Sequence, residues 1–121
     1  MAITLYDLVG RDDRRFSSNC CKTVYALAHK GLAFKTVPTR FIDIAEIRGG
    51  ELKTVPVIRD GDRWVGDSWN IAVYLEKTYP DEASVFGGVG GIEHARFVAQ
   101  WNASEIQPLV MTMIVNDIYQ R

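Results

Sequence analysis

A short polar run, Ser17-Ser18-Asn19-Cys20-Cys21, holds the residue types best suited to thiol chemistry. Serine and asparagine are good helix N-caps, and apolar residues at helical spacing follow the run as far as Lys30. A serine hydroxyl at a helix start can donate a hydrogen bond to a thiolate, and the helix N-terminus favours the same negative charge. Ser17, Ser18 and Asn19 are therefore all candidates to cap this helix, and a hydroxyl at Ser17 would also suit the stabilisation of a thiolate.

Cys20 and Cys21 are the only cysteines, and they are adjacent. Neighbouring cysteines rarely pair, so a reducing, cytosolic compartment is expected rather than a disulfide framework. Cys20 has the spacing from Ser17 of the second sulfur in a Cys-x-x-Cys pair, but the serine removes dithiol chemistry. For Cys21 the alternative to a reactive thiol is a buried structural one. His29 and His94 are isolated, and no ligand spacing indicates a metal.

A second informative run begins at Thr54-Val55-Pro56-Val57-Ile58. The position alone favours a trans proline at the entrance of a strand, because only about 5–6% of X–Pro bonds in folded proteins are cis. The alternative is a cis bond, which would present the backbone N–H and C=O of Val55 to a peptide-like ligand. The spacing leaves both states open.

Asp67 and Ser68 precede a helical pattern that extends from Trp69 to Lys77. Both residue types cap helices well. The same N–H groups and the helix dipole can also hold a ligand carboxylate, and Asp67 can pair with a ligand ammonium. Capping and ligand binding are compatible at this helix start.

The elements that must position these residues follow from hydrophobic periodicity and turn signals. The chain is predicted to form strands at 3–8, 33–37, 57–59 and 63–65, and helices at 20–30, 42–48 and 69–77. Gly31 suits the C-terminus of the first helix, and Pro38 restricts the second strand to an edge or ends it. Asp60-Gly61 is the predicted hairpin turn.

The order β-α-β-α-β-β-α predicts an α/β fold. Its first two strands should be parallel with a right-handed crossover, and the hairpin should add antiparallel strands. A mixed four-stranded sheet with helices on its faces would then occupy residues 1–80. A glycine-rich linker is expected at 81–91, and residues 92–121 read as helix with a kink at Pro108. One or two apolar helices cannot bury themselves, so this segment is predicted to be the start of a truncated all-α domain.

Composition excludes several classes of function. The 121 residues carry a net charge of −1, with 47% hydrophobic and 24% charged residues, which gives no reason to expect nucleic acid or an anionic membrane as partner. No apolar run approaches the roughly 20 residues of a membrane span. The N-terminus reads as a strand and not as a signal peptide.

Taken together, the element order, the Val55-Pro56 step and the run from Asp67-Ser68 through Tyr79-Pro80 resemble the thioredoxin-like N-terminal half of cytosolic glutathione transferases. The first strand, the charged loop before Ser17 and the run Tyr25-Ala26-Leu27-Ala28-His29-Lys30-Gly31 are most similar to bacterial β-etherases of lignin breakdown and the fungal FuA class. In such proteins a serine at the first helix is often followed by proline. Ser18 replaces that proline here, which leaves Ser17 the first catalytic candidate and Ser18 the second.

The resemblance implies a role for each matching residue. Val55 should pair with the cysteinyl backbone of glutathione across a cis Pro56, and Asp67 with Ser68 should hold the γ-glutamyl end. Lys53 or Thr54 should approach the glycine carboxylate. The remaining residues expected at the site are Asn19 and Phe41 beside glutathione, and Phe97 and Trp101 at the electrophile pocket, where core packing is the alternative.

The implied function is a cytoplasmic, homodimeric glutathione transferase. Glutathione would be its co-substrate, and the thiolate would attack a small apolar or aromatic electrophile, with β-aryl ether cleavage as a specific case. One alternative is a glutathione-dependent thiol reductase that uses Cys20 or Cys21. Another is a non-catalytic binding module that keeps the fold.

Overall fold

The computed structural model describes residues 2–119, so residues 1, 120 and 121 of the predicted segments lie outside it. The chain divides into two compact units, one ending at Val85 and the other beginning at Phe86. The first unit contains β1 (Ile3–Leu8), α1 (Ser18–Lys30), β2 (Phe34–Thr39), η2 (Phe41–Gly50), β3 (Val57–Asp60), β4 (Arg63–Gly66) and α2 (Ser68–Thr78). This order confirms the predicted β-α-β-α-β-β-α fold, with η2 as a 3-10 helix in the second helical position.

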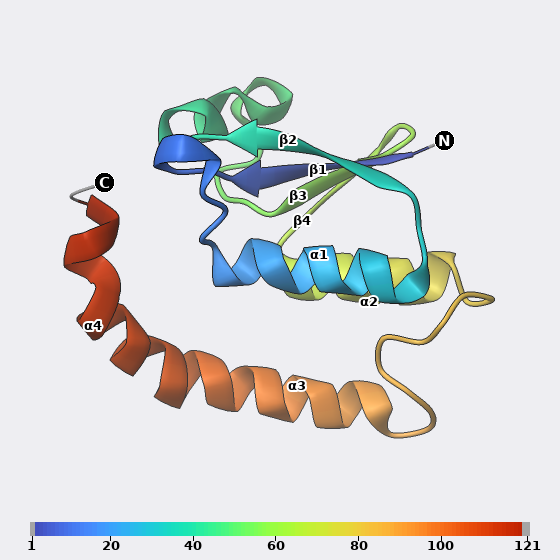
Figure 1. Cartoon of the computed structure of the whole chain (residues 1–121). Helices are drawn as coiled ribbons and strands as arrows, with labels where there is room; N and C mark the ends of the chain where they lie inside the picture. Colours follow the sequence, from blue (N-terminus) through green and yellow to red (C-terminus); the bar gives the residue numbers. More distant parts are fainter. Residues whose placement is uncertain (1, 120–121) are drawn as a thin grey trace. The chain divides into compact units, whose positions relative to one another are not determined.

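The sheet has the strand order β2-β1-β3-β4. β1 and β2 are parallel, whereas β3 is antiparallel to both β1 and β4. Figure 1 shows α1 and α2 side by side on one face of this sheet. The core lies between these two layers and consists of Ile3, Leu5, Ala26, Leu27, Ile58, Ile71 and Leu75. Burial of each larger aliphatic side chain contributes about 1.5–3 kcal/mol to folding.

The ends of α1 follow the capping signals. Ser17 is the N-cap, and its side chain accepts a hydrogen bond from the backbone N–H of Cys20. Gly31 ends the helix in the left-handed conformation, at φ 72°, which glycine adopts without steric cost. The buried Lys30 donates to Glu76 Oε1 at 2.8 Å and to the Ala83 carbonyl at 3.1 Å. These bonds fix the segment after α2 against the end of α1.

The helix η2 covers part of the opposite face. Its regular geometry breaks at Ile47, Arg48 and Gly49, and Ile47 is buried. The Arg48 guanidinium lies 6.0 Å from the ring centroid of Trp64 on β4, which attaches the end of η2 to the sheet by a cation–π contact. Trp64 also stacks on Tyr6, with ring centroids 5.7 Å apart.

Two local predictions need correction. β2 continues through Pro38 to Thr39, which is possible because β2 is an edge strand. The hairpin turn lies one residue later than predicted, at Gly61-Asp62, because Asp60 pairs with Arg63 and stays in the ladder.

The second unit contains α3 (Gly91–Trp101), a π-helical turn η3 (Asn102–Ile106) and α4 (Gln107–Tyr119). The π turn ends two residues before Pro108, which cannot donate a backbone hydrogen bond and whose ring would crowd a regular helical turn. Apolar side chains including Phe97, Leu109 and Met113 are exposed on these helices. Within residues 2–119, none of the helices is both long and apolar enough to cross a bilayer.

Candidate functional site

The predicted site residues of the first unit converge at one end of the sheet, the end to which the β1 arrow points in Figure 1. The last row paired across β1, β3 and β4 consists of Tyr6, Val57 and Gly66. The next residues at this end are Asp7, Pro56 and Asp67. β1 then continues through a loop to the start of α1. The sheet register therefore brings together three segments that are far apart in the sequence.

Ser17 is only partly exposed, and its Oγ lies 3.2 Å from the Cys20 backbone nitrogen, from which it accepts a hydrogen bond. A hydroxyl group has one proton to donate and two lone pairs to accept with. Because the helix cap uses a lone pair, the proton of Ser17 is left to donate to an anion. The cap and the predicted thiolate contact are therefore made by different parts of the same hydroxyl.

The two cysteines differ sharply in exposure. Cys20 is 1% exposed and Cys21 is exposed, so the alternative of a buried structural Cys21 is wrong. The helical phase explains this, since Cys20, Thr23, Leu27 and Lys30 all lie on the buried face of α1. Burial raises the pKa of the Cys20 thiol, and the charge of Asp7 adds to that effect. Both effects argue against Cys20 as a reactive thiol.

The Val55–Pro56 peptide bond is cis, as the family resemblance implied and contrary to the position-based preference. Pro56 is buried, while Val55 is partly exposed. The bond lies immediately before β3. Thr54, on the other side of Val55, is exposed.

Asp67 is the N-cap of α2, and its Oδ2 accepts from the Asn70 backbone N–H at 3.1 Å. Its backbone has φ 70° and ψ 127°, a conformation that is rare and strained for a residue other than glycine, at a cost of about 1–3 kcal/mol. Strain of this kind gathers at functional sites. Ser68 begins α2 and is partly exposed.

Phe41 and Lys53 line one open groove, together with Ile44, Ala45 and Gly50. Sequence reasoning missed Phe16, whose ring centroid lies 6.2 Å from that of Phe41. Phe16 directly precedes Ser17, so this contact joins the groove on η2 to the start of α1. The only sequence signal for it was an aromatic residue beside the catalytic candidate.

An ion pair below the start of α1 was also missed. Arg15 Nη1 lies 3.1 Å from Oδ2 of the buried Asp7 and 3.2 Å from Thr36 Oγ1. Arg15 also contacts Asp13, with 2.9 Å between Nη2 and Oδ1. The pKa of Arg15 is raised by the two carboxylates, although burial opposes this.

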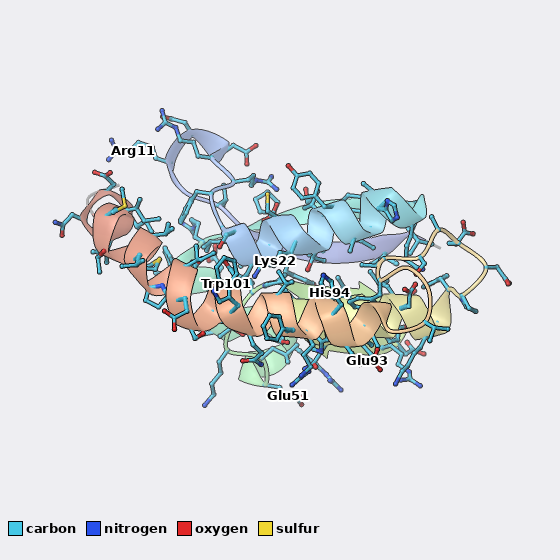
Figure 2. All side chains as sticks on the ribbon, turned by 90° about the horizontal axis from the view of Figure 1, so that it is seen from below. Arg11, Lys22, Glu51, Glu93, His94 and Trp101 are labelled. Atoms are coloured by element: carbon cyan, nitrogen blue, oxygen red, sulfur yellow. The ribbon has the colours of Figure 1, made fainter. Side chains whose placement is uncertain are left out.

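The other predicted residues lie on helix surfaces. Ser18 and Asn19 are exposed on the first turn of α1, and Asn19 Oδ1 accepts from Lys22 Nζ at 3.1 Å. In the second unit, Phe97 is 73% and Trp101 is 53% exposed, one helical turn apart on α3. Figure 2 shows Trp101 on this helix and Lys22 on α1. The roles of Phe97 and Trp101, at an electrophile pocket or in core packing, stay predictions.

In the described part of the chain, no group of three or more His, Cys, Asp or Glu side chains is placed to hold a metal ion. The groups that the structure places at the sheet edge are the Ser17 hydroxyl, the N-termini of α1 and α2, and the partly exposed Val55.

Known proteins resemble this chain in sequence and fold. A family model described as the N-terminal domain of glutathione S-transferase matches residues 16–78. A glutathione S-transferase of Ceriporiopsis subvermispora, solved in complex with glutathione, is 32% identical with a TM-score of 0.74, and the match covers 90% of this chain and 49% of that one. The glutathione transferase GSTFuA2 of Phanerochaete chrysosporium is 27% identical with a TM-score of 0.83, over 98% of this chain and 54% of that one.

A glutathione transferase homologue from Burkholderia with bound glutathione is 26% identical with a TM-score of 0.71, over 90% of this chain and 57% of that one. This chain thus spans about half the length of the solved structures that it matches. The family model covers more than half of its 121 residues and includes α1, the cis proline and the start of α2. The chain belongs to the glutathione S-transferase family, of which it carries the N-terminal domain.

Proposed function

We propose that this chain binds glutathione at the sheet edge and that the hydroxyl group of Ser17 donates a hydrogen bond to the glutathione thiolate. The observation that carries the proposal is the cap geometry of Ser17, whose Oγ already accepts from Cys20 and has its proton left to donate. A charge-assisted hydrogen bond of this kind is about twice as strong as a neutral one. The positive end of α1 adds to the stabilisation of the thiolate.

The rest of glutathione has suitable partners at the same edge. Val55 can pair its backbone N–H and C=O with the cysteinyl residue in β fashion. The carboxylate of Asp67 suits the γ-glutamyl ammonium, while the N-terminus of α2 at Ser68 suits the γ-glutamyl carboxylate. Lys53, in the groove with Phe41, suits the glycine carboxylate, with Thr54 and Asn19 at the margins of the site. Relatives solved with bound glutathione support glutathione as the ligand.

The reaction that follows is nucleophilic transfer. The glutathione thiol loses its proton to solvent, and the sulfur then forms a bond to an electrophilic carbon as the bond from that carbon to its leaving group breaks. In a β-aryl ether the leaving group is an aryloxide. The proposal includes a small aromatic electrophile, with the exposed Phe97 and Trp101 as its binding residues and Ser18 as the second candidate hydroxyl. The proposal includes a homodimer in the cytoplasm.

Glutathione titration followed by turnover tests the proposal. The chain should bind glutathione in calorimetry and should be retained on glutathione resin. With aryl ethers and halogenated aromatics as electrophiles, Ser17→Ala should lower turnover while leaving glutathione affinity nearly unchanged. Ser18→Ala is the matched control, since Ser18 is exposed and does not cap α1. Failure to bind glutathione would contradict the proposal, and turnover unaffected by Ser17→Ala would transfer the role to Ser18 or to backbone N–H groups.

A further inference from the structure

A buried carboxylate lies beneath the start of α1. Asp7, in the last part of β1, is 5% exposed and is close enough to Cys20 for its charge to act on that thiol. The Cys20 backbone nitrogen is in turn 3.2 Å from Ser17 Oγ. The carboxylate is therefore a negative charge near the start of α1, where the hydroxyl of Ser17 would face a thiolate.

Such a charge opposes the proposed function if it stands alone. A like charge nearby disfavours ionisation, and burial reduces the screening that water would provide. Asp7 would then cancel part of the effect of the helix N-terminus on a thiolate at Ser17. A positively charged group therefore has to offset the charge of Asp7 if the start of α1 is to stabilise a thiolate.

Arg15 is placed to do this. Its Nη1 lies 3.1 Å from Asp7 Oδ2, and its side chain is 28% exposed, so the pair is partly shielded from solvent. The contact of Arg15 with Thr36 Oγ1 orients the same guanidinium nitrogen, and the contact with Asp13 holds its other side. The described contacts place two titratable groups beside Asp7, the Arg15 guanidinium and the Cys20 thiol. A third, the Asp13 carboxylate, is linked to Asp7 only by way of Arg15.

We propose that Arg15 is a positioning residue that neutralises Asp7 and so keeps the N-terminus of α1 available to a thiolate at Ser17. The inference rests on the proposed function for its biological meaning, because the thiolate is that of glutathione. Its physical content is a charge balance within the chain, which can be measured without glutathione.

The competing explanation is a purely mechanical one. Arg15 closes a charged loop in which Gly10 N donates to the Arg14 carbonyl and Asp12 and Asp13 have positive φ angles. Removal of Arg15 could then act only by displacing Ser17. The two explanations predict different results when Asp7 is neutralised in a variant that already lacks Arg15. An electrostatic effect of losing Arg15 should then be reversed, whereas a displaced loop should not be restored.

The test places a thiol at the site itself. Ser17→Cys is made in a Cys21→Ser background, so that the introduced thiol is the exposed one and Cys20 stays buried. Its pKa is measured from the rate of alkylation by iodoacetamide as a function of pH, with mass spectrometry to assign the product. The variants compared are Arg15→Gln, Arg15→Lys, Asp7→Asn and the double variant Asp7→Asn/Arg15→Gln.

Arg11→Gln is the matched control, because it removes the same charge from the same loop. Figure 2 shows Arg11 on the loop that projects beyond the start of α1, and its side chain makes none of the described ion pairs. Circular dichroism of each variant shows whether it is folded.

Arg15→Gln should raise the pKa of the introduced thiol by about one unit, and Asp7→Asn alone should lower it by about as much. The double variant should return the pKa close to its starting value, and Arg15→Lys should stay near it because the charge is kept. If Arg15→Gln does not fold, the test depends on the other two variants. The pKa of the introduced thiol should still fall in Asp7→Asn and should stay unchanged in Arg15→Lys.

The inference would be overturned if Arg15→Gln and Arg11→Gln changed the pKa of the introduced thiol by the same amount. A double variant that keeps the full rise would also overturn it, since the effect would then be loop displacement. The proposed function would be contradicted by a different result, namely that the unmodified chain does not bind glutathione in calorimetry.

Discussion

Ser17 Oγ lies 3.2 Å from the backbone nitrogen of Cys20, and this contact defines both the start of α1 and the direction left open to the hydroxyl proton. The same residue therefore links folding to chemistry. Its lone pair stabilises the helix, and its proton is available to an anion at the helix N-terminus. The two contributions can be separated by measurement.

Ser17→Ala should lower the free energy of unfolding by about 1 kcal/mol, because α1 loses its side-chain cap. It should also lower turnover by roughly 10²-fold, since one preorganised donor to the reacting anion is removed. Chemical denaturation and steady-state kinetics measure the two effects. Ser17→Thr keeps the hydroxyl and should retain much of both properties, so equal losses in Ser17→Thr and Ser17→Ala would contradict this account.

Asp67 combines a cap with a charge, and two variants separate them. Asp67→Asn keeps a capping oxygen and tolerates the left-handed backbone, so stability should change little while glutathione binding weakens by about 2–5-fold. Asp67→Ala should lose about 1 kcal/mol of stability as well. Thermal unfolding and calorimetric titration provide the readouts. Binding that is unchanged in Asp67→Asn would exclude a contact between this carboxylate and the ligand ammonium.

The two cysteines should react at very different rates. Cys21 is exposed and should be alkylated in the folded chain, whereas Cys20 is buried with a raised pKa and should react only after unfolding. Peptide mapping after brief treatment with iodoacetamide distinguishes the two sites. Labelling of Cys20 as fast as Cys21 in the native state would contradict the structure. Because Cys20 is buried in the folded chain, a thiol reductase mechanism would have to use Cys21, and Cys21→Ser tests that alternative.

Asp60 should make the chain sensitive to alkaline pH. Its Oδ2 accepts hydrogen bonds from Tyr79 at 2.7 Å and Tyr74 at 2.8 Å. The bond to Asp60 raises the pKa of Tyr79 to about 12, and burial adds to the effect. A pKa above the unfolded value of about 10 means that the protonated phenol stabilises the fold. This contribution is fully present below about pH 10 and is lost as pH rises through about 12.

Ultraviolet titration of tyrosine ionisation checks this prediction. Asp60→Asn should move the late ionisation of Tyr79 toward lower pH, because it removes the carboxylate that accepts the hydrogen bond of Tyr79. A late phase that persists unchanged in Asp60→Asn would show that burial, and not the hydrogen bond, is the main cause.

The fold was largely predictable because its signals are local. Apolar spacing, Gly31 and the Asp67 cap gave the correct elements and their order. Pro38 left two alternatives open, an edge strand or a strand end, and the edge alternative is confirmed, because the place of β2 in the sheet is a property of the whole topology. The cis state of Pro56 came from family resemblance, since base rates alone favour trans.

The candidate site was predictable only where single residues carried the signal. Ser17 and Asp67 were found because caps have recognisable types and positions. The Asp7–Arg15 ion pair and the contact of Phe16 with Phe41 depend on how the loop after β1 and the helix η2 pack, so the residue spacing did not reveal them. The match to GSTFuA2 agrees with the fungal resemblance, while similarity to bacterial β-etherases stays a prediction.

The most direct test of the central claim is the pKa of glutathione bound to the chain, followed through the ultraviolet absorbance of its thiolate as pH is varied. The predicted result is a pKa clearly below that of a free thiol, which is about 8.5 for cysteine, and a rise toward the free value in Ser17→Ala but not in Ser18→Ala. A bound thiol that ionises at the same pH as free glutathione, or one that Ser17→Ala does not affect, would contradict the assignment of Ser17.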